Sequence, residues 1–427
     1  MAPIKVVLVG AGDRARTYSE YALQCPDKMQ VVGLVDPRAE AILVSKQRFD
    51  VPDERCFSSV EEFLKAPRFA DAIINGTMDQ LHVETTVPLL DAGYDVLLEK
   101  PFAISDEEVD VLCEAAKRNN RFVMICHVLR YAPFYNLIKQ NILAGKIGEI
   151  VNIQLSEEVS YHHMAASYIR GKWSSEKICY APMLLAKCCH DVDLMIWFNS
   201  DTVADSVASF GSNYQFTPER KPEGSADRCA DCKIERECEY SCFKHYIERK
   251  AWGQYVWTCF DGMKPTEEDK INSLKTDNQY GRCVWACEEH DVVDHQSVIV
   301  NFKNGSTGTL NMVGGASDGV RDIRIVGTKG EIIGNFKEQK FVIQTIDPDS
   351  KDMYNTEVID VNETKDIDGM TGAHGGGDLR LAADFIDHLI TGNHSIACTE
   401  VTASAIGHKI VFAAERSRKT GEIVKIK

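Results

Sequence analysis

The sequence predicts an α/β protein with a doubly wound parallel sheet, followed by an α+β part with a large open, mostly antiparallel sheet. Short apolar strands alternate with helical stretches from Ile4 to about residue 126, as in a sheet covered by helices on both faces. After residue 148 the strands alternate polar and apolar residues, which is typical of a half-buried antiparallel sheet. We therefore expect two domains, residues 1–130 and 131–427, with an irregular insert over residues 213–290.

The composition is that of a globular protein with a sizeable core, because 44% of the 427 residues are hydrophobic. The formal net charge of −16 argues against nucleic acid and anionic membrane surfaces as partners, since both attract clustered Lys and Arg. No run reaches the ~18 apolar residues of a membrane span. With fifteen cysteines and no visible secretory signal, we expect reduced thiols and a cytoplasmic location.

A glycine-rich turn joins the first strand to the first helix. Its sequence, Gly10-Ala-Gly12-Asp-Arg14-Ala15, follows the G-x-G-x-x-A pattern of dinucleotide-binding Rossmann domains. Gly10 permits the tight turn, Gly12 lets the backbone approach a pyrophosphate, and the small Ala15 allows close packing of helix on strand. Free N–H groups at the helix start attract phosphates. We expect Gly10, Gly12 and Arg14 to contact the cofactor.

The second strand ends in Asp36, 24 positions beyond Gly12. A carboxylate at this place can accept hydrogen bonds from the adenosine ribose, which favours NAD over NADP. Arg38 lies close by and could instead hold a 2′-phosphate. We therefore expect Asp36 and Arg38 to face the cofactor, with NAD as the preferred form.

Two further strand ends of this domain carry polar residues. Thr77 follows one strand and His82 the loop after it, and the next strand ends in Glu99-Lys100-Pro101. Ligands of open α/β sheets bind at the carboxyl ends of the strands, so we expect Thr77, His82, Glu99 and Lys100 near the cofactor. Taken alone, Lys100 is either a salt-bridged structural residue or a proton donor and acceptor.

The glycine-rich turn, the Asp36 strand end, the segment from Thr77 to His82 and Glu99-Lys100-Pro101 resemble the glucose–fructose oxidoreductase/inositol dehydrogenase/MocA (Gfo/Idh/MocA) family. The resemblance continues into the second half of the chain. It implies a nicotinamide cofactor, a sugar or polyol substrate, and a role for Lys100 in proton transfer. It also implies that Arg130 lies beside the nicotinamide and the substrate.

The loop after the strand that begins at Gly148 holds His163, Arg170 and Trp173, which we expect to bind substrate. His162 and His163 are adjacent, and adjacent side chains on a strand point to opposite faces, so at most one of the two faces the substrate. A surface or packing role remains the alternative.

A helix expected from residue 182 to residue 198 carries Lys187, His190 and Asp191. Lys187 shares one helical face with the other two, and a cation beside an imidazole lowers its pKa for acid–base work. We expect Lys187 and His190 to be catalytic together with Lys100, and Asp191 to bind substrate. In the family this helix supplies an aspartate four residues before the histidine, and Ala186 stands at that position here.

The insert contains Cys229, Cys232, Cys238 and Cys242, a C-x2-C-x5-C-x3-C spacing. Closely spaced thiolates can hold a tetrahedral zinc ion, and an iron–sulfur cluster is the other candidate. Because the spacing matches neither common ferredoxin pattern, it favours structural zinc, and Cys283, Cys287 or His245 could replace one ligand. A reduced cysteine-rich loop without metal is the alternative.

The chain as a whole is expected to be an NAD(P)-dependent enzyme that transfers a hydride between a nicotinamide cofactor and a sugar, polyol or sugar derivative. Two alternatives remain: a redox-neutral NAD-dependent glycosidase or epimerase that oxidises the sugar transiently, and a non-catalytic NAD-binding sensor. We expect the open sheet to pair subunits in a homo-oligomer. His374 could reach substrate, or could precede a helix capped by Asp378.

Overall fold

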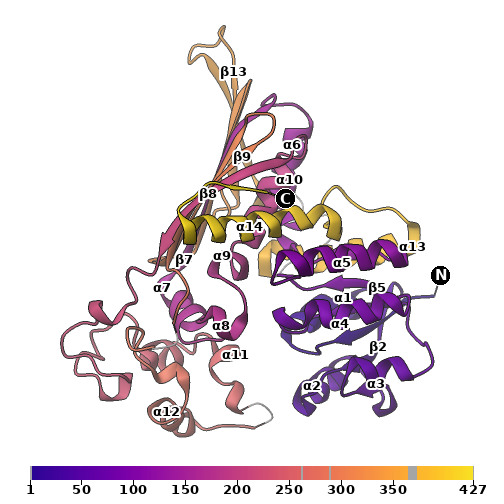
Figure 1. The fold of residues 1–427 in the computed structure, drawn as a ribbon, viewed down its shortest axis with the longest axis vertical. Coiled ribbons are helices and arrows are strands. Elements are labelled where there is room, and N and C mark those ends of the chain that lie inside the picture. The colour runs from indigo at the N-terminus through magenta and orange to yellow at the C-terminus, as the bar shows by residue number, and fades with distance from the viewer. Residues whose placement is uncertain (1, 261–262, 288–289, 364–372, 427) are drawn as a thin grey trace.

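The computed structural model describes residues 2–260, 263–287, 290–363 and 373–426, and these residues form two sheets with helices around them (Figure 1). The α/β class and the two kinds of sheet are as the sequence predicts. None of the helices in this part of the chain is long and apolar enough to cross a membrane.

The first sheet has six parallel strands in the order β3-β2-β1-β4-β5-β6. This is the strand order of the Rossmann fold, and its ligand crevice lies where the order reverses, between β1 and β4. The bounds of its strands and helices are β1 Ile4–Val9, α1 Asp13–Gln24, β2 Met29–Val35, α2 Ala39–Phe49, β3 Cys56–Phe57, α3 Val60–Lys65, β4 Ala72–Asn75, α4 His82–Asp91, β5 Asp95–Leu98, α5 Asp106–Asn119 and β6 Val123–Ile125.

The second sheet has nine strands in the order β14-β13-β12-β11-β7-β10-β9-β8-β15. Its strands pair antiparallel except β7 with β10. The strand bounds are β7 Ile150–Ser160, β8 Ala204–Ser212, β9 His295–Phe302, β10 Thr307–Ala316, β11 Val320–Gly327, β12 Gly330–Asn335, β13 Lys340–Ile346, β14 Tyr354–Asp360 and β15 Val424–Lys425. Helices cover one face, so the inward positions of each strand are buried and the outward ones are exposed.

The carboxy-terminal helices tie the two sheets together. α14, the long yellow helix in Figure 1, packs against α5 of the first half and against β8 of the second sheet. α13 packs against α1 beside the glycine-rich turn. The helices of the second half have the bounds α6 Pro133–Leu143, α7 Tyr161–His163, α8 Glu176–Cys179, α9 Met183–Ala186, α10 Cys189–Phe198, α13 Gly377–Thr391 and α14 Val401–Thr420.

Two local expectations are wrong. Tyr161–His163 form a helical turn after the end of β7, so the two histidines do not alternate along a strand. The helix expected over 182–198 is two helices, because the helical hydrogen bonding is interrupted at Lys187 and Cys188, between α9 and α10. The break exposes the carbonyl groups at the end of α9 to other partners.

The insert lies below the second sheet in Figure 1 and consists of short helices and irregular backbone. Its main helical segments are η7 Phe243–Glu248, α11 Gly253–Val256 and α12 Glu267–Lys275. A small separate cluster of buried side chains holds it together, including Cys242, Tyr246 and Leu274. The insert therefore has little apolar core of its own.

Candidate active site

The glycine-rich turn has room for a phosphate group. Gly10 has a φ of 73°, and a Cβ there would lie 2.6 Å from the backbone nitrogen of Thr77, so a side chain does not fit. Gly12 precedes α1 with no side chain capping the helix, and a Cβ on it would meet only the Arg38 guanidinium at 3.7 Å. The N–H groups of the first turn of α1 are thus open toward a ligand, which fits the pyrophosphate of a dinucleotide.

Asp36 and Arg38 lie together at the end of β2. The Asp36 carboxylate is buried and accepts a hydrogen bond of 2.9 Å from the backbone N–H of Arg38. The Arg38 guanidinium also donates to Asp36, at 3.3 and 3.5 Å, and its side chain is 61% exposed. The guanidinium therefore partly neutralises the carboxylate that is expected to hold the ribose.

The side chain of Arg14 binds two carboxylates of the protein itself. It forms ion pairs with Glu99 at 2.8 Å and with Asp378 at 2.6 Å, and it donates to the Tyr18 hydroxyl at 2.5 Å. Burial opposes ionisation of Glu99, but Arg14 and Lys100 hold the pKa of Glu99 below its usual value. Arg14 and Glu99 thus brace the turn. Asp378 takes part in this bracing and does not cap α13, whose N-cap is Gly376. The side chain of His374 lies outside the described residues.

Thr77 and His82 follow β4, and the ring of His82 links this loop to the segment after β5. The Thr77 hydroxyl donates to the side chain of Asn75 at 2.8 Å. His82 is fully buried, and its ring nitrogens lie 2.7 Å from the carbonyl oxygen of Pro101 and 3.1 Å from that of Thr77. His82 therefore holds the Lys100–Pro101 segment in position against the Thr77 loop.

Lys100 extends from the end of β5 toward the second half of the chain. Its ammonium donates a hydrogen bond of 3.1 Å to the carbonyl oxygen of Ala186, at the end of α9. No carboxylate of the described residues forms an ion pair with it. The ammonium can thus offer its remaining N–H groups to a bound molecule.

Lys187 belongs to a buried cluster of four charges. Its ammonium lies 3.1 Å from Glu157, and Arg321 lies 2.5 Å from Glu157 and 2.9 Å from Asp191. Burial, opposed by Arg321 and assisted by the charge of Glu157, raises the pKa of Asp191 to about 6. Lys187 is thus paired, in contrast to Lys100.

His190 lies on the first turn of α10 and is buried. Its ring meets that of His127 edge to face, with the centroids 5.6 Å apart. Burial lowers the pKa of His127 to about 4, although Asp193 opposes this. His408 accepts a hydrogen bond from the backbone N–H of Phe102, so its ring is neutral as well. His190 therefore contacts the neutral imidazole of His127, and His127 in turn contacts that of His408.

His163 faces the same region as Lys100 and Lys187. Burial lowers the pKa of His163 to about 2, and the charges of Lys187, Arg321 and Lys100 contribute to this. The Trp252 ring of the insert stacks on His163, with the centroids 4.6 Å apart, and Tyr255 stacks in turn on Trp252. His163 is neutral at ordinary pH, and the insert supplies an aromatic wall beside it.

Three expected site residues have other partners. Arg130 is buried and makes a two-pronged ion pair with Asp193, at 2.6 and 2.7 Å, plus a bond to the carbonyl of Cys398. Trp173 donates to Asp79 at 3.3 Å. Arg170 lies inside the insert, bound to backbone carbonyls and to Cys229.

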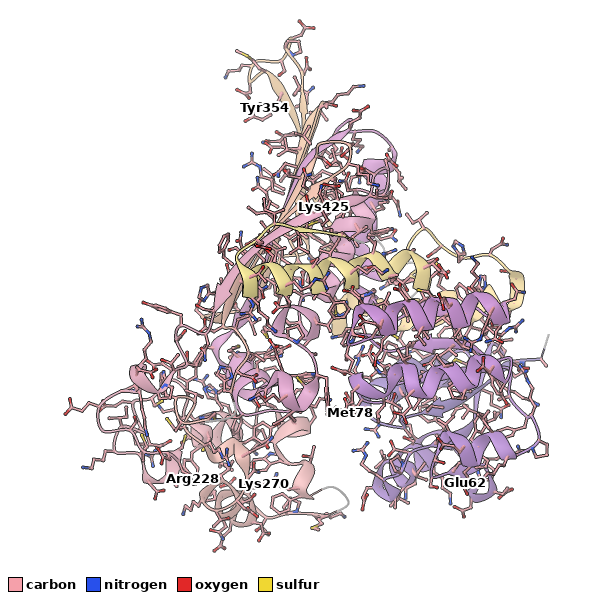
Figure 2. All side chains as sticks on the ribbon, in the orientation of Figure 1. Glu62, Met78, Arg228, Lys270, Tyr354 and Lys425 are labelled. Carbon is pink, nitrogen blue, oxygen red and sulfur yellow. The ribbon has the colours of Figure 1, made fainter. Side chains whose placement is uncertain are left out.

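The contact of Trp173 with Asp79 joins the two halves of the chain. Beside it, the Lys172 ammonium lies 3.7 Å from the sulfur of Met78, which Figure 2 labels on the edge of the first half that faces the second. Trp173 and Lys172 thus link the substrate-side loop to the loop after β4.

The expected zinc site is not supported. Among the described residues, which include Cys229, Cys232, Cys238 and Cys242, no three side chains of His, Cys, Asp or Glu are placed to hold a single metal ion. The sulfur atoms of this region are all free thiols.

The sequence reasoning missed Glu157, Arg321, Trp252 and Tyr255. Two of them carry a readable signal: Glu157 occupies the inward phase of β7, with Leu155 and Val159, and Arg321 stands directly opposite it on β11. A charge on the inward phase of an amphipathic strand indicates a buried ion pair. The aromatic pair has no such signal, because the insert lacks periodicity.

Comparison with known proteins identifies the family. The model of the NAD-binding Rossmann fold of the Gfo/Idh/MocA oxidoreductase family matches residues 4–127, and that of the family's C-terminal α/β domain matches residues 139–426. The putative oxidoreductase YteT of Bacillus subtilis is 26% identical over 366 residues, which cover 83% of this chain and 81% of YteT.

One further relative matches less of the chain, and two solved structures share the fold of nearly all of it. The scyllo-inositol 2-dehydrogenase (NADP(+)) IolW of Bacillus subtilis is 28% identical over 153 residues, or 36% of this chain and 41% of IolW. Levoglucosan dehydrogenase in complex with NADH and levoglucosan superposes with a TM-score of 0.72, at 16% identity and 99% coverage of both chains. The WlbA dehydrogenase of Bordetella pertussis, in complex with NADH and UDP-GlcNAcA, gives 0.68 at 17% identity, covering 100% of this chain and 98% of WlbA. These structural likenesses establish the fold.

Proposed function

The chain belongs to the Gfo/Idh/MocA family of NAD-binding oxidoreductases, and we propose that it oxidises a secondary hydroxyl of a sugar, polyol or sugar derivative. The names of its relatives, an inositol dehydrogenase and a levoglucosan dehydrogenase, support this substrate class. The observation that carries the proposal is Lys100 at the end of β5, next to the crevice between β1 and β4: its ammonium is oriented by the carbonyl of Ala186 and forms no ion pair with a carboxylate of the described residues.

The residues of the turn fit a nicotinamide dinucleotide. The N–H groups at the start of α1 would hold the pyrophosphate, and Asp36 would accept hydrogen bonds from the adenosine ribose, which favours NAD over NADP. Arg38 partly neutralises Asp36 and stays available to a 2′-phosphate. When bound, the nicotinamide would supply the hydride chemistry.

The proton is handled by this chain's own residues. We assign Lys100 as the group that binds the reacting hydroxyl and takes up or returns its proton, because the carbonyl of Ala186 orients its ammonium. His190 is the candidate to share the proton, and His163, which burial keeps neutral, would bind the substrate. Lys187 is held by Glu157, so we give it a positioning role in the buried charge cluster.

We also propose the division into residues 1–130, which hold the cofactor, and residues 131–427, which hold the substrate and the subunit contacts. The outward face of the second sheet supports a homo-oligomer, because it exposes apolar side chains on β8, β9, β10, β12 and β14 that a second copy could cover. These are Phe210, Ile299, Val313, Ile333 and Val358.

The test is a panel of sugars, polyols and glycosides incubated with NAD and, separately, with NADP. A dehydrogenase forms reduced cofactor and oxidised product in equal amounts. Cleaved or epimerised product without net reduced cofactor would instead support the redox-neutral alternative. Binding of NAD without turnover of any compound in the panel would support the sensor, and would contradict the assignment of Lys100.

A further inference from the structure

Two side chains of the second half lie near the crevice in which the first half is expected to hold its cofactor. One is Lys172, on the loop that contacts the segment after β4, and the other is Tyr255, on α11 of the insert. Each carries a hydrogen-bond donor, so each can bind a molecule in the crevice. Neither lies on the glycine-rich turn or at a strand end of the first sheet, so no dinucleotide-binding pattern points to them.

The ammonium of Lys172 is held at a defined place. It lies 3.7 Å from the sulfur of Met78, on the loop after β4, and 4.2 Å from the centre of the Trp173 ring. Trp173 itself donates to Asp79 at 3.3 Å. A thioether is only a weak acceptor, and no carboxylate of the described residues forms an ion pair with this ammonium. Lys172 therefore keeps N–H donors for a bound anion.

The charges around Lys172 place it over the middle of the first sheet. Partial desolvation and the like charges of Lys100 and Arg38 lower the pKa of its ammonium, and Asp79 and Glu99 oppose this. Arg38 follows β2 and Lys100 follows β5, and the strands between these two are β1 and β4. The ammonium is thus close to the point where the strand order reverses, at which a Rossmann sheet binds its ligand.

Tyr255 is held by aromatic rings on two sides. Its ring stacks on Trp252, with the centroids 5.9 Å apart, and meets the ring of Trp173 edge to face at 6.2 Å. The Trp252 indole donates to His162 at 3.2 Å, and its φ of 61° is a left-handed conformation that bulky residues seldom adopt. Such strained residues occur mostly at functional sites. The segment is therefore a fixed part of the wall beside the active site.

The hydroxyl of Tyr255 lies near the start of α1. Burial raises the pKa of Tyr255, Asp13 and Glu99 add to this, and Arg14 and Lys100 oppose it. Asp13 and Arg14 belong to the first turn of α1, whose N–H groups are open toward a pyrophosphate. The hydroxyl has no hydrogen-bond partner among the described residues, although the hydroxyl of a buried tyrosine usually finds one. It is thus a donor left for a molecule bound at this turn.

We propose that Lys172 and Tyr255 bind the pyrophosphate of the dinucleotide, so that the second half of the chain encloses the cofactor. The inference rests on the nicotinamide cofactor proposed above. The glycine-rich turn offers backbone N–H groups, and the ammonium and the phenol add a charge-assisted and a neutral hydrogen bond from the other half. A pyrophosphate also brings negative charge to two ammonium groups, Lys172 and Lys100, that otherwise repel each other. Through Tyr255, the insert governs how fast the cofactor leaves.

Cofactor binding to the full-length protein tests this without any substrate. NADH is titrated by fluorescence, and ADP and adenosine, which differ by two phosphates, compete with it. We expect Lys172→Met to weaken the binding of NADH and ADP about tenfold and to leave that of adenosine unchanged, and Lys172→Arg to restore most of the loss. Tyr255→Phe keeps the ring and should release NADH several-fold faster in stopped-flow experiments. The matched controls Lys177→Met and Tyr280→Phe should bind NADH as the wild type does.

Equal NADH affinity of the wild type and Lys172→Met would overturn the role of Lys172, as would an equal loss for adenosine, because the effect would then not depend on the phosphates. If Lys172→Met binds NADH normally but raises KM for glucose 6-phosphate and glucuronate more than for glucose, the ammonium binds an anionic substrate and the assignment to the cofactor is wrong.

Unchanged release of NADH from Tyr255→Phe would overturn the role of Tyr255. A wild type that binds neither NADH nor NADPH would contradict the proposed cofactor itself. A wild type that binds NADH no better than both variants would contradict only the enclosure by the second half, so the two failures are distinguishable.

Discussion

The ammonium of Lys100 donates a hydrogen bond of 3.1 Å to the backbone carbonyl of Ala186. Ala186 occupies the position where the family resemblance leads one to expect an aspartate. A backbone carbonyl can orient the lysine whatever side chain stands at position 186, but it cannot accept a proton. The partner of Lys100 in proton transfer must therefore be another group, and His190 lies in the same region, beside His127.

Replacing Lys100 should remove catalysis without removing the cofactor. We expect Lys100→Met to lower kcat by about 10²-fold or more, because Lys100 is the ammonium that the carbonyl of Ala186 orients at the end of β5. NADH binding, measured by fluorescence, should change little. The matched variant Lys187→Met removes a lysine that Glu157 neutralises, and we expect it to destabilise the protein more than it slows turnover. Unchanged turnover of Lys100→Met would refute the assignment.

The pair of Asp36 and Arg38 should set the cofactor preference. We expect Asp36→Asn to weaken binding of NAD by about tenfold, since a charge-assisted bond to the ribose is lost. Arg38→Ala should leave NAD binding within a few-fold and weaken NADP binding. Titration of both cofactors into both variants gives the four affinities. A wild-type preference for NADP that Arg38→Ala abolishes would show that Arg38, and not Asp36, dominates.

The buried carboxyl of Asp191 should make stability depend on pH. Burial raises its pKa to about 6, while in an unfolded chain it is about 3.9. The folded state thus keeps a proton that the unfolded state releases, so this group favours folding below about pH 4 and loses that effect as the pH rises toward about 6. Asp191→Asn does not titrate.

We therefore expect the unfolding free energy of the wild type, relative to that of Asp191→Asn, to fall between about pH 4 and about pH 7. Denaturant unfolding at several pH values measures it, with Glu157, Arg321, Lys187 and Tyr135 as the other ionisable neighbours in both proteins. A difference that is constant or grows with pH would mean that Asp191 is ionised throughout.

Removing the aromatic wall should expose His163. Burial, to which Trp252 contributes by stacking, is the largest cause of its low pKa. In Trp252→Ala we expect the pKa of His163 to rise toward its ordinary value of about 6.5, and KM for the substrate to increase several-fold. Trp257→Ala, in the same insert, is the control and should leave His163 unchanged. NMR titration of the histidine ring measures this directly, and equal effects of both variants would speak against the wall.

Much of the fold is legible in the sequence because it depends on local patterns. The apolar runs of β1, β2, β4 and β5 predict a parallel sheet, and the glycines of the first turn predict that it binds a dinucleotide. The change to alternating residues predicts the second sheet. The insert, with no periodicity, could not be predicted in this way, and the break between α9 and α10 was missed because both halves have helical composition.

The sequence by itself determined the sheets, the glycine turn, Asp36 and the position of Lys100 at a strand end, because strand, turn and helix signals lie within a few residues of one another. The tertiary structure alone decided which groups meet: Lys100 with Ala186, Glu157 with Arg321, His163 with Trp252, and Trp173 with Asp79. Such contacts join residues far apart in the chain, and they follow from sheet register and packing, which no local pattern encodes.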